Sequence, residues 1–288
     1  MVKSLAPHVG FGAQQKWFRT GQVRLNGKRV KGAERVEIDD LLRLPPQAQR
    51  QNAREEQGPD PKLVEQLTQS VLHDDGSVLA FNKPSGLAVQ GGSKTKRHID
   101  GVLPAFTNDA GEVPRLVQRT RFGVLVRAAT QDREMAAALT KAFAARDAKK
   151  TYFAIVTHWP EDQDAGVIDA PLVKARVGGE ERVMVDFDHP EAQSAQTFFR
   201  VEQRSRSGRV LMALEPRTGR THQLRVHVLH VGGAILGDGK YGVRLPSDWG
   251  APKRLYLHAA SLEIDHPKGG QLELHAPLPS AFKEALNA

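Results

Sequence analysis

The densest group of side chains suited to chemistry lies in the string LEPRTGRTHQLRVHVLHVGGAILGDGKYG, residues 214–242. After a turn at its RTG triplet, apolar residues recur at helical spacing, which predicts a helix. Arg220, His222 and Gln223 stand together where this helix would begin. Because a guanidinium and the free amides of a helix N-terminus both favour a phosphate or a carboxylate, the group indicates an anion site.

Two threonines frame the predicted start of this helix. The hydroxyl of Thr218 or Thr221 is placed to accept a hydrogen bond from an amide of the first turn, which would cap the helix. Five glycines follow between residues 232 and 242, a pattern typical of backbone folded tightly against another surface. The same spacing also fits an amphipathic helix whose basic face is only solvated.

Several predicted elements must position this group. Residues 131–146 have the apolar spacing of a helix, and residues 149–156 follow as a strand that carries Tyr152 near its start. By pattern alone Tyr152 is a half-buried core aromatic. A strand at residues 78–81 follows an Asp-Asp-Gly turn, and residues 166–199 alternate like a hairpin with its turn near His189-Pro190.

The N-terminal 45 residues read as a small basic module. A helix over residues 13–19 leads into two strands joined by Asn26-Gly27, a strong hairpin signal because both residues tolerate positive φ. Its expected core includes Val36, Ile38, Leu41 and Leu44. The basic side chains would line one surface suited to phosphate contacts; they are Lys16, Arg19, Arg24, Lys28, Arg29 and Lys31.

Composition narrows the class of protein further. The chain has 288 residues, with 41 Lys and Arg against 33 Asp and Glu, so its formal charge is +8 and an acidic partner such as nucleic acid is expected. Absence of cysteine excludes disulfides and thiolate chemistry. No apolar run approaches the roughly 20 residues of a membrane helix, and the histidines lack metal-ligand spacing. We expect a cytoplasmic monomer without a metal site.

Three strings, GRTHQLRVH with ILGDGKYG, KTYFAIV, and NKPSG, resemble the signatures of the RluA family of pseudouridine synthases. The resemblance implies an α+β protein whose synthase domain, residues 62–288, is a mixed, mainly antiparallel β-sheet with flanking helices. Residues 1–45 resemble the S4-like RNA-binding domain that precedes many such synthase domains, and residues 46–61 read as a linker. The first helix of that module is short here, and Asp39 stands where the module commonly has Gly.

The resemblance also implies roles for individual residues. Arg220 would hold the catalytic Asp, and Tyr152 would pack against the target base. Thr221, His222 and Gln223 would support them. The family uses no cofactor, and its expected partner is structured RNA, ribosomal RNA in particular. A basic loop would touch the RNA backbone; its cations are Lys94, Lys96 and Arg97.

The second family signature is interrupted. It runs Arg-Leu-Val-His-Arg-Leu-Asp-x-x-Thr-Ser-Gly-Val-Leu in the family, where Asp is the catalytic residue, but this chain reads RLVQRTRFGVL from Arg115. Arg119 matches the Arg before the Asp, about three residues are missing before Gly123, and no acidic residue stands between Arg115 and Val126. Two functions stay open: an RNA pseudouridine synthase that uses another carboxylate, and a catalytically silent relative that binds ribosomal RNA.

Overall fold

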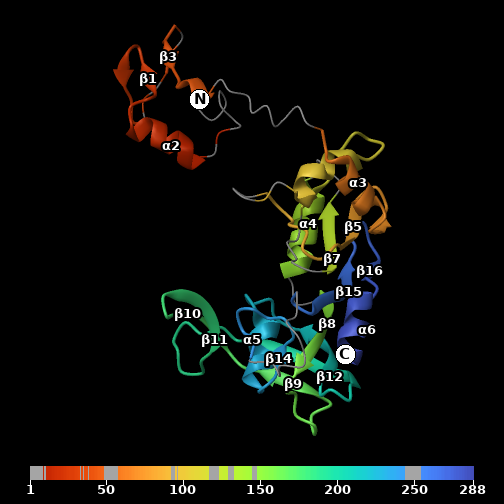
Figure 1. Ribbon diagram of the computed structural model, residues 1–288. Helices are drawn as coiled ribbons and strands as arrows, with labels where there is room; N and C mark the ends of the chain where they lie inside the picture. The colour runs from red at the N-terminus through yellow and green to blue at the C-terminus, as the bar shows by residue number, and fades with distance from the viewer. Residues whose placement is uncertain are drawn as a thin grey trace. The chain divides into compact units, whose positions relative to one another are not determined.

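The computed structural model describes residues 9, 11–32, 34, 36–37, 39–48, 58–91, 95, 97–116, 123–128, 133–144, 148–243 and 254–288. The chain divides into two compact units, Met1–Asp60 and Pro61–Ala288, which Figure 1 shows in red and in orange through blue. Among the described residues, no helix is long and apolar enough to cross a membrane.

The first unit is a helix beside a three-stranded antiparallel sheet of order β2-β1-β3. Its elements are α2 (Phe11–Arg19), β1 (Arg24–Leu25), β2 (Lys28–Arg29), β3 (Leu42–Arg43) and the 3-10 helix η1 (Pro46–Ala48). The predicted hairpin is confirmed, since β1 pairs with β2 across Asn26 and Gly27, which have φ of 50° and 80°. Trp17, Val23 and Val30 form most of the small core.

Leu41 does not belong to this core. Its side chain is 73% exposed, so the prediction that placed it inside was wrong. Successive side chains of a strand point to opposite faces, and here Leu42 and Leu44 point inward while Leu41 and Arg43 point outward. Of the other predicted core positions, Ile38 lies outside the described residues.

Asp39 has φ of 80°, a left-handed conformation that a residue with a Cβ adopts at a cost of about 1 kcal/mol. We expect Asp39→Gly to stabilise the first unit by about 0.5 kcal/mol, because the relief of strain exceeds the entropy that glycine adds to the unfolded chain. Hydrogen exchange of the amides in α2 and β1 in the full chain measures this gain. Asp39→Ala keeps the Cβ and serves as the control. An equal gain in stability from this variant would show that backbone strain at residue 39 is not the cause.

The second unit contains a four-stranded antiparallel sheet of order β4-β5-β7-β6. Its strands are β4 (Val71–Asp74), β5 (Val78–Lys83), β6 (Arg115–Leu116) and β7 (Gly123–Ala128). Alternate side chains of β5 pack on the two faces. Leu79 and Phe81 pack with α3 (Pro61–Thr68) and the 3-10 helix η2 (Ile99–Phe106), whereas Val78 and Ala80 pack with α4 (Arg133–Ala144). The predicted helix over residues 131–146 is thus confirmed over the part the structure describes.

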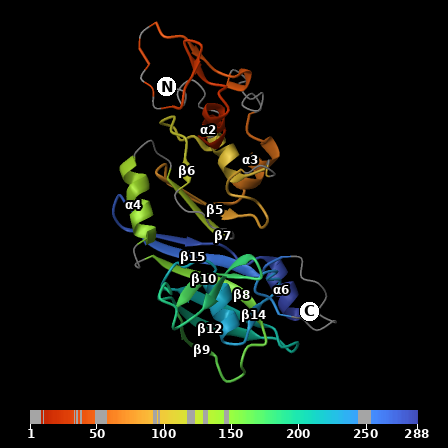
Figure 2. The ribbon, with the colours of Figure 1, turned by 90° about the vertical axis from the view of Figure 1, so that its left-hand side faces the viewer.

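A seven-stranded sheet follows in the order β16-β15-β8-β13-β12-β9, with β14 also paired to β8. Figure 2 shows this sheet in blue, cyan and green beside the four-stranded one. Every strand pairing in it is antiparallel. Its strands are β8 (Lys149–Thr157), β9 (Ala165–Asp169), β12 (Gln196–Arg204), β13 (Val210–Pro216), β14 (Ala234–Ile235), β15 (Leu257–Asp265) and β16 (Gln271–His275).

Two helices cover opposite faces of the long sheet. On one face Ala154 and Val156 of β8 pack with α5 (Gln223–His230), and on the other face Ile155 packs with α6 (Ser280–Asn287). The second unit is therefore a mixed α+β structure with antiparallel sheets and few helices, which confirms the fold class that the family resemblance implied.

The predicted turn near His189-Pro190 is confirmed, since the Ala192 amide donates to the His189 carbonyl oxygen at 3.0 Å. The hairpin predicted around it was wrong, because the described strands β11 (Glu180–Val185) and β12 do not pair. The hairpin in this region joins β10 (Leu172–Val177) to β11, and it turns at Gly178-Gly179 with φ of 60° and 83°. Two consecutive glycines with positive φ give the turn whose twist suits a two-residue hairpin. Residues 189 and 190 instead lie in the connection between β11 and β12, and β12 pairs with β9 and β13.

Candidate functional site

The loop before α5 is organised by the side chain of Gln223. Its Oε1 accepts hydrogen bonds from the Thr218 hydroxyl at 2.6 Å and from the Arg220 amide at 3.0 Å. Neither predicted threonine caps α5. The cap residue is His222, which has φ of 56° and makes no capping hydrogen bond through its side chain. The first helical side chain reaches back instead, in the manner of the acceptor in a capping box.

The side-chain amide nitrogen of Gln223 is the first donor in a buried chain of hydrogen bonds. Its Nε2 donates to the Thr197 hydroxyl oxygen at 3.0 Å, and Thr197 Oγ1 lies 2.9 Å from His227 Nδ1. His227 Nε2 faces the carbonyl oxygen of Ala170 at 3.0 Å. Because a carbonyl only accepts, Nε2 carries the proton of the neutral ring and the Thr197 hydroxyl donates to Nδ1. Burial lowers the pKa of His227, which favours this neutral form.

Sequence reasoning missed the charged pair that this helix buries. Arg225 donates from Nε and Nη2 to the two carboxylate oxygens of Asp238 at 2.6 and 2.5 Å, and its guanidinium lies 4.8 Å from the ring centroid of Tyr241. Burial alone raises the pKa of Asp238, but the hydrogen bonds from Arg225 and from the amides of Lys240 and Tyr241 outweigh it, so the pKa is lowered. The sequence signal for this pair was Arg225 in the HQLRVH string and Asp238 in the ILGD string.

His222 joins the same cluster. Its Nδ1 lies 2.8 Å from the hydroxyl oxygen of Tyr241, whose ring is buried. The Tyr241 hydroxyl also accepts a hydrogen bond from the Val183 amide of β11 at 3.0 Å. With that acceptor position filled by an amide, the hydroxyl proton is free to be donated to Nδ1. Tyr241 thus ties α5 to the β10–β11 hairpin.

Tyr152 lies in the centre of the seven-stranded sheet. It is opposite Leu214 of β13 on one side and Ala259 of β15 on the other. Its side chain shares the face of Ala154 and Val156, which α5 covers, and burial raises its pKa. Since β13 ends two residues after Leu214, the topology brings Tyr152 to the end of the sheet from which the loop before α5 departs.

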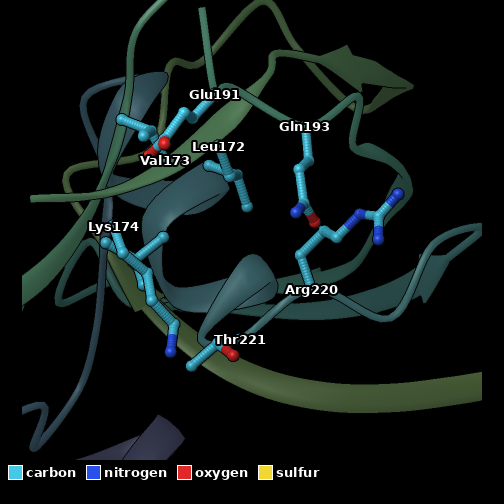
Figure 3. Close-up of a pocket in the computed structure, with 8 residues that line it drawn as sticks. Leu172, Val173, Lys174, Glu191, Gln193, Arg220 and Thr221 are labelled. Atoms are coloured by element: carbon cyan, nitrogen blue, oxygen red, sulfur yellow. The ribbon is translucent and has the colours of Figure 1, made fainter. Parts of the chain in front are cut away.

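Arg220 and Thr221 line a cavity of about 440 Å³ with residues of β10, β11 and the connection to β12. Figure 3 shows the hollow between Thr221, Lys174, Glu191 and Gln193, with the Arg220 guanidinium directed away from its centre and alongside Gln193. Arg220 Nε donates to the Ser194 carbonyl oxygen at 3.3 Å. Tyr152, His222 and Gln223 are not among the described residues that line this cavity.

Arg119 and the rest of the interrupted signature, residues 117–122, lie outside the described residues. The strand that follows them is described: Gly123 of β7 pairs with Lys83 of β5. The Lys83 ammonium is buried and donates to the carbonyl oxygens of Pro84 and Leu87 at 3.0 and 2.9 Å, which closes the turn of the NKPSG string.

Burial lowers the pKa of Lys83 to about 8. In the unfolded chain the Lys83 ammonium has a pKa of about 10.4. Between about pH 8 and about pH 10.4 the unfolded state therefore binds more protons than the folded state, so the free energy of unfolding rises with pH. We expect the free energy of unfolding to increase from pH 7.5 to pH 9.5 by about 2 kcal/mol more than it does in Lys83→Met. Urea unfolding at both pH values measures the difference, and parallel pH dependence of the two proteins would contradict it.

The exposed cations of the first unit do not share one surface. Arg24 of β1 lies directly opposite Arg29 of β2 and Arg43 of β3, so these three side chains project from one face of the small sheet. Lys28 pairs with Leu25 and shares the opposite face. Arg43 was not predicted, because its place depends on a pairing between residues far apart in sequence. Lys16 and Arg19 are exposed on α2.

The basic loop of the second unit is described only in part. Arg97 is exposed, whereas Lys94 and Lys96 lie outside the described residues. Within the described part of the chain, no group of three or more His, Asp and Glu residues is arranged to hold a metal ion.

Comparison with known proteins gives a consistent result. A family model for RNA pseudouridylate synthase matches residues 77–230. Ribosomal large subunit pseudouridine synthase C of Vibrio cholerae is 35% identical over 278 residues, covering 93% of this chain and 85% of the relative. The Vibrio parahaemolyticus protein of the same name is 33% identical over 277 residues, covering 93% and 84%.

Among solved structures, Human RNA Pseudouridylate Synthase Domain Containing 4 superposes with a TM-score of 0.64 at 30% identity, over 78% of this chain and 94% of that one. Residues 77–230, which match the family model, contain Tyr152 and the loop before α5 with its hydrogen-bonded Gln223. On this sequence and structural evidence, the chain belongs to the RNA pseudouridylate synthase family.

Proposed function

We propose that this chain binds structured RNA, ribosomal RNA in particular, and isomerises uridine to pseudouridine in it. Family membership supports the reaction class, and the relatives named above as ribosomal large subunit synthases support the RNA class. One structural observation carries the proposal: Tyr152 lies at the end of the sheet where the loop of residues 217–222 leaves β13. An aromatic ring at the end of the sheet from which the loop carrying Arg220 departs suits a base taken out of its stack.

The reaction breaks the bond from uracil nitrogen to ribose, turns the base and rejoins it through carbon. In our proposal Tyr152 packs against the turned base, and Arg220 and Thr221 contact the RNA at the rim of the cavity. His222 and Gln223 position that loop through their hydrogen bonds to Tyr241 and Thr197. No step requires a cofactor.

We also propose that the first unit is an S4-like RNA-binding module that contacts RNA phosphates through one face of its sheet. Like charges directly opposite each other in a sheet are destabilising without an anionic partner. Arg24, Arg29 and Arg43 are all exposed, and no ion pair joins any of them to another described residue. Charge complementarity therefore favours a polyanion on this face.

Replacing Arg43 tests that face. We expect Arg43→Ala to lower the slope of log affinity against log salt by about 0.7 to 0.9, the change for one lost phosphate contact. Filter binding of the full chain to ribosomal RNA over a range of salt concentrations measures it. Lys28→Ala, on the opposite face of the same hairpin, should change the slope less; an equal or larger change would contradict the assignment.

A second candidate is a catalytically silent RNA-binding protein. It is favoured by the sequence from Arg115 to Val126, which contains no acidic residue. Asp238 is a poor substitute, because its two oxygens already accept hydrogen bonds from Arg225, Lys240 and Tyr241. A carboxylate saturated in this way has little remaining capacity to act as a nucleophile or base.

Incubation of the purified chain with unmodified ribosomal RNA, followed by chemical labelling of pseudouridine, separates the two candidates. Robust product at a defined uridine supports the synthase and rules out the silent protein. Tight RNA binding without product supports the silent protein. Absence of RNA binding at physiological salt would contradict both.

A further inference from the structure

The loop of residues 217–222 runs alongside the start of β12. The Arg217 amide donates to the Gln196 carbonyl oxygen at 2.9 Å, and Arg220 Nε donates to the Ser194 carbonyl oxygen at 3.3 Å. Both arginines are exposed. Arg217 therefore presents a second guanidinium on the loop that carries Arg220, and the proposed function gives that second group no role.

The Arg217 guanidinium is held by an aromatic ring. Its Cζ lies 4.8 Å from the centroid of the Phe198 ring, within the distance of a cation–π contact. Phe198 belongs to the sheet face opposite α5, because the side chains on either side of it in β12, Thr197 and Phe199, lie on the face that α5 covers. No hydrogen bond or ion pair joins the Arg217 guanidinium to another described residue. The group is thus placed by Phe198 and can be reached by a ligand from its solvent side.

A second cavity, of about 180 Å³, has Arg217 in its wall. The other residues that line it are Asp169, Ser194, Ala195, Gln196 and Thr218. It is smaller than the roughly 300 to 1,000 Å³ of sites that enclose a drug-sized ligand, which suits a single base.

The polar groups of this cavity favour a base over a phosphate. Gln196 Nε2 donates to Asp169 Oδ2 at 3.1 Å, so an amide and a carboxylate stand together in its wall. A phosphate would be repelled by the Asp169 carboxylate. An uncharged nucleobase avoids this repulsion, and its amino and ring N–H groups are donors that a carboxylate can accept.

We propose that Arg217 stacks on an unpaired base of the RNA close to the target uridine, and that the adjoining cavity receives the polar edge of that base. This inference rests on the proposed function, since it requires that the chain bind RNA. Unpaired bases of RNA stack on the planes of arginine guanidinium groups as well as on aromatic rings. Because Phe198 already holds the guanidinium, little side-chain freedom is lost when the base binds.

The Thr218 hydroxyl connects this site to Arg220. Its oxygen accepts from the Gln196 amide at 3.2 Å, and its proton is donated to Gln223 Oε1 at 2.6 Å. The same Oε1 accepts from the Arg220 amide at 3.0 Å. A base held by Arg217 therefore lies beside the backbone that positions Arg220. Arg217 acts in the binding and placement of the RNA and has no part in the chemical step.

The test uses the ribosomal RNA fragment that the full chain protects from nuclease, prepared as a set of versions that each lack one unpaired base. We expect one version to bind the unaltered chain about tenfold more weakly than the intact fragment does, because stacking of one base contributes about this much. Arg217→Lys keeps the charge and loses the planar guanidinium. It should bind that version and the intact fragment with affinities within about twofold of each other.

Arg206→Lys is the matched control. It makes the same exchange at an exposed arginine in the turn that joins β12 to β13, at the other end of that hairpin from Arg217. This variant should keep the roughly tenfold difference between the two RNAs. Nuclease protection and filter binding at constant salt supply all of these affinities.

Other results would contradict the inference. If the intact fragment binds and removal of no single base weakens it, the stacking site is overturned and the proposed RNA binding stands. A difference that survives unchanged in Arg217→Lys would place the stacked base on another residue. If no ribosomal RNA is protected or bound at physiological salt, the proposed function fails and this site fails with it.

Discussion

If the chain is the catalytically silent candidate, replacing Thr120-Arg121-Phe122 with a six-residue family segment that begins Leu-Asp is expected to raise the rate of pseudouridine formation at least about 100-fold. A positioned carboxylate contributes factors of about 10² to 10⁴ through acid–base chemistry alone, and misplacement by about 1 Å can remove a factor of 10². The replacement supplies an Asp and gives the segment after Arg119 the length of the family signature. Single-turnover assays on unmodified ribosomal RNA measure the rate.

The matched control inserts the same six residues with Asn in place of Asp. It has the same length and nearly the same shape but no carboxylate, so it should stay as slow as the unaltered chain. If the unaltered chain already forms pseudouridine at the rate of the Asp variant, another carboxylate performs the reaction. In that case the reading of residues 115–126 as a lost site is wrong.

Asp238→Asn is expected to lower the free energy of unfolding by about 3 to 5 kcal/mol, because it leaves the Arg225 guanidinium buried without a counter-charge. The side chains of Asp238 and Arg225 are only 1% and 12% exposed. Asparagine keeps one carbonyl oxygen for the amides of Lys240 and Tyr241, so most of the loss should come from the unpaired charge. Urea unfolding at pH 7 measures it.

Two further variants isolate the electrostatic part of this loss. Arg225→Met combined with Asp238→Asn removes both charges and should recover part of the stability. Asp164→Asn breaks the ion pair with Arg204 at 2.9 Å, where the Asp164 side chain is 77% exposed, and should cost less than about 1 kcal/mol. A cost below 1 kcal/mol for Asp238→Asn itself would show that burial of the pair is unimportant.

Local patterns predicted the elements that depend on neighbouring residues. The Asn26-Gly27 hairpin, the helix that became α4 and the strand that carries Tyr152 all follow from turn chemistry or periodicity within about 15 residues. The turn at Gly178-Gly179 was not predicted although its two glycines are a local signal, because the apolar alternation around His189 also fits a hairpin.

The site was less predictable, because its contacts join residues far apart in sequence. Thr197 and Gln223 are 26 residues apart, and Val183 and Tyr241 are 58 apart. A hydroxyl at a predicted helix start suggests a cap, but in the folded chain the Thr218 hydroxyl donates to the side chain of Gln223. The pairing of Arg225 with Asp238 likewise becomes visible only when α5 and the residues after β14 are placed together.

The pairing of β7 with β5 has a consequence for how this chain tolerates change. Gly123, Val124 and Leu125 stay in register with Lys83, Asn82 and Phe81, so the pairing of this strand does not require the sequence between Arg119 and Gly123 to match the family signature. Scaffold and chemistry are then separable properties of this protein. Substitutions in the segment before Gly123 can therefore alter the chemistry of this protein while the paired strands stay as they are.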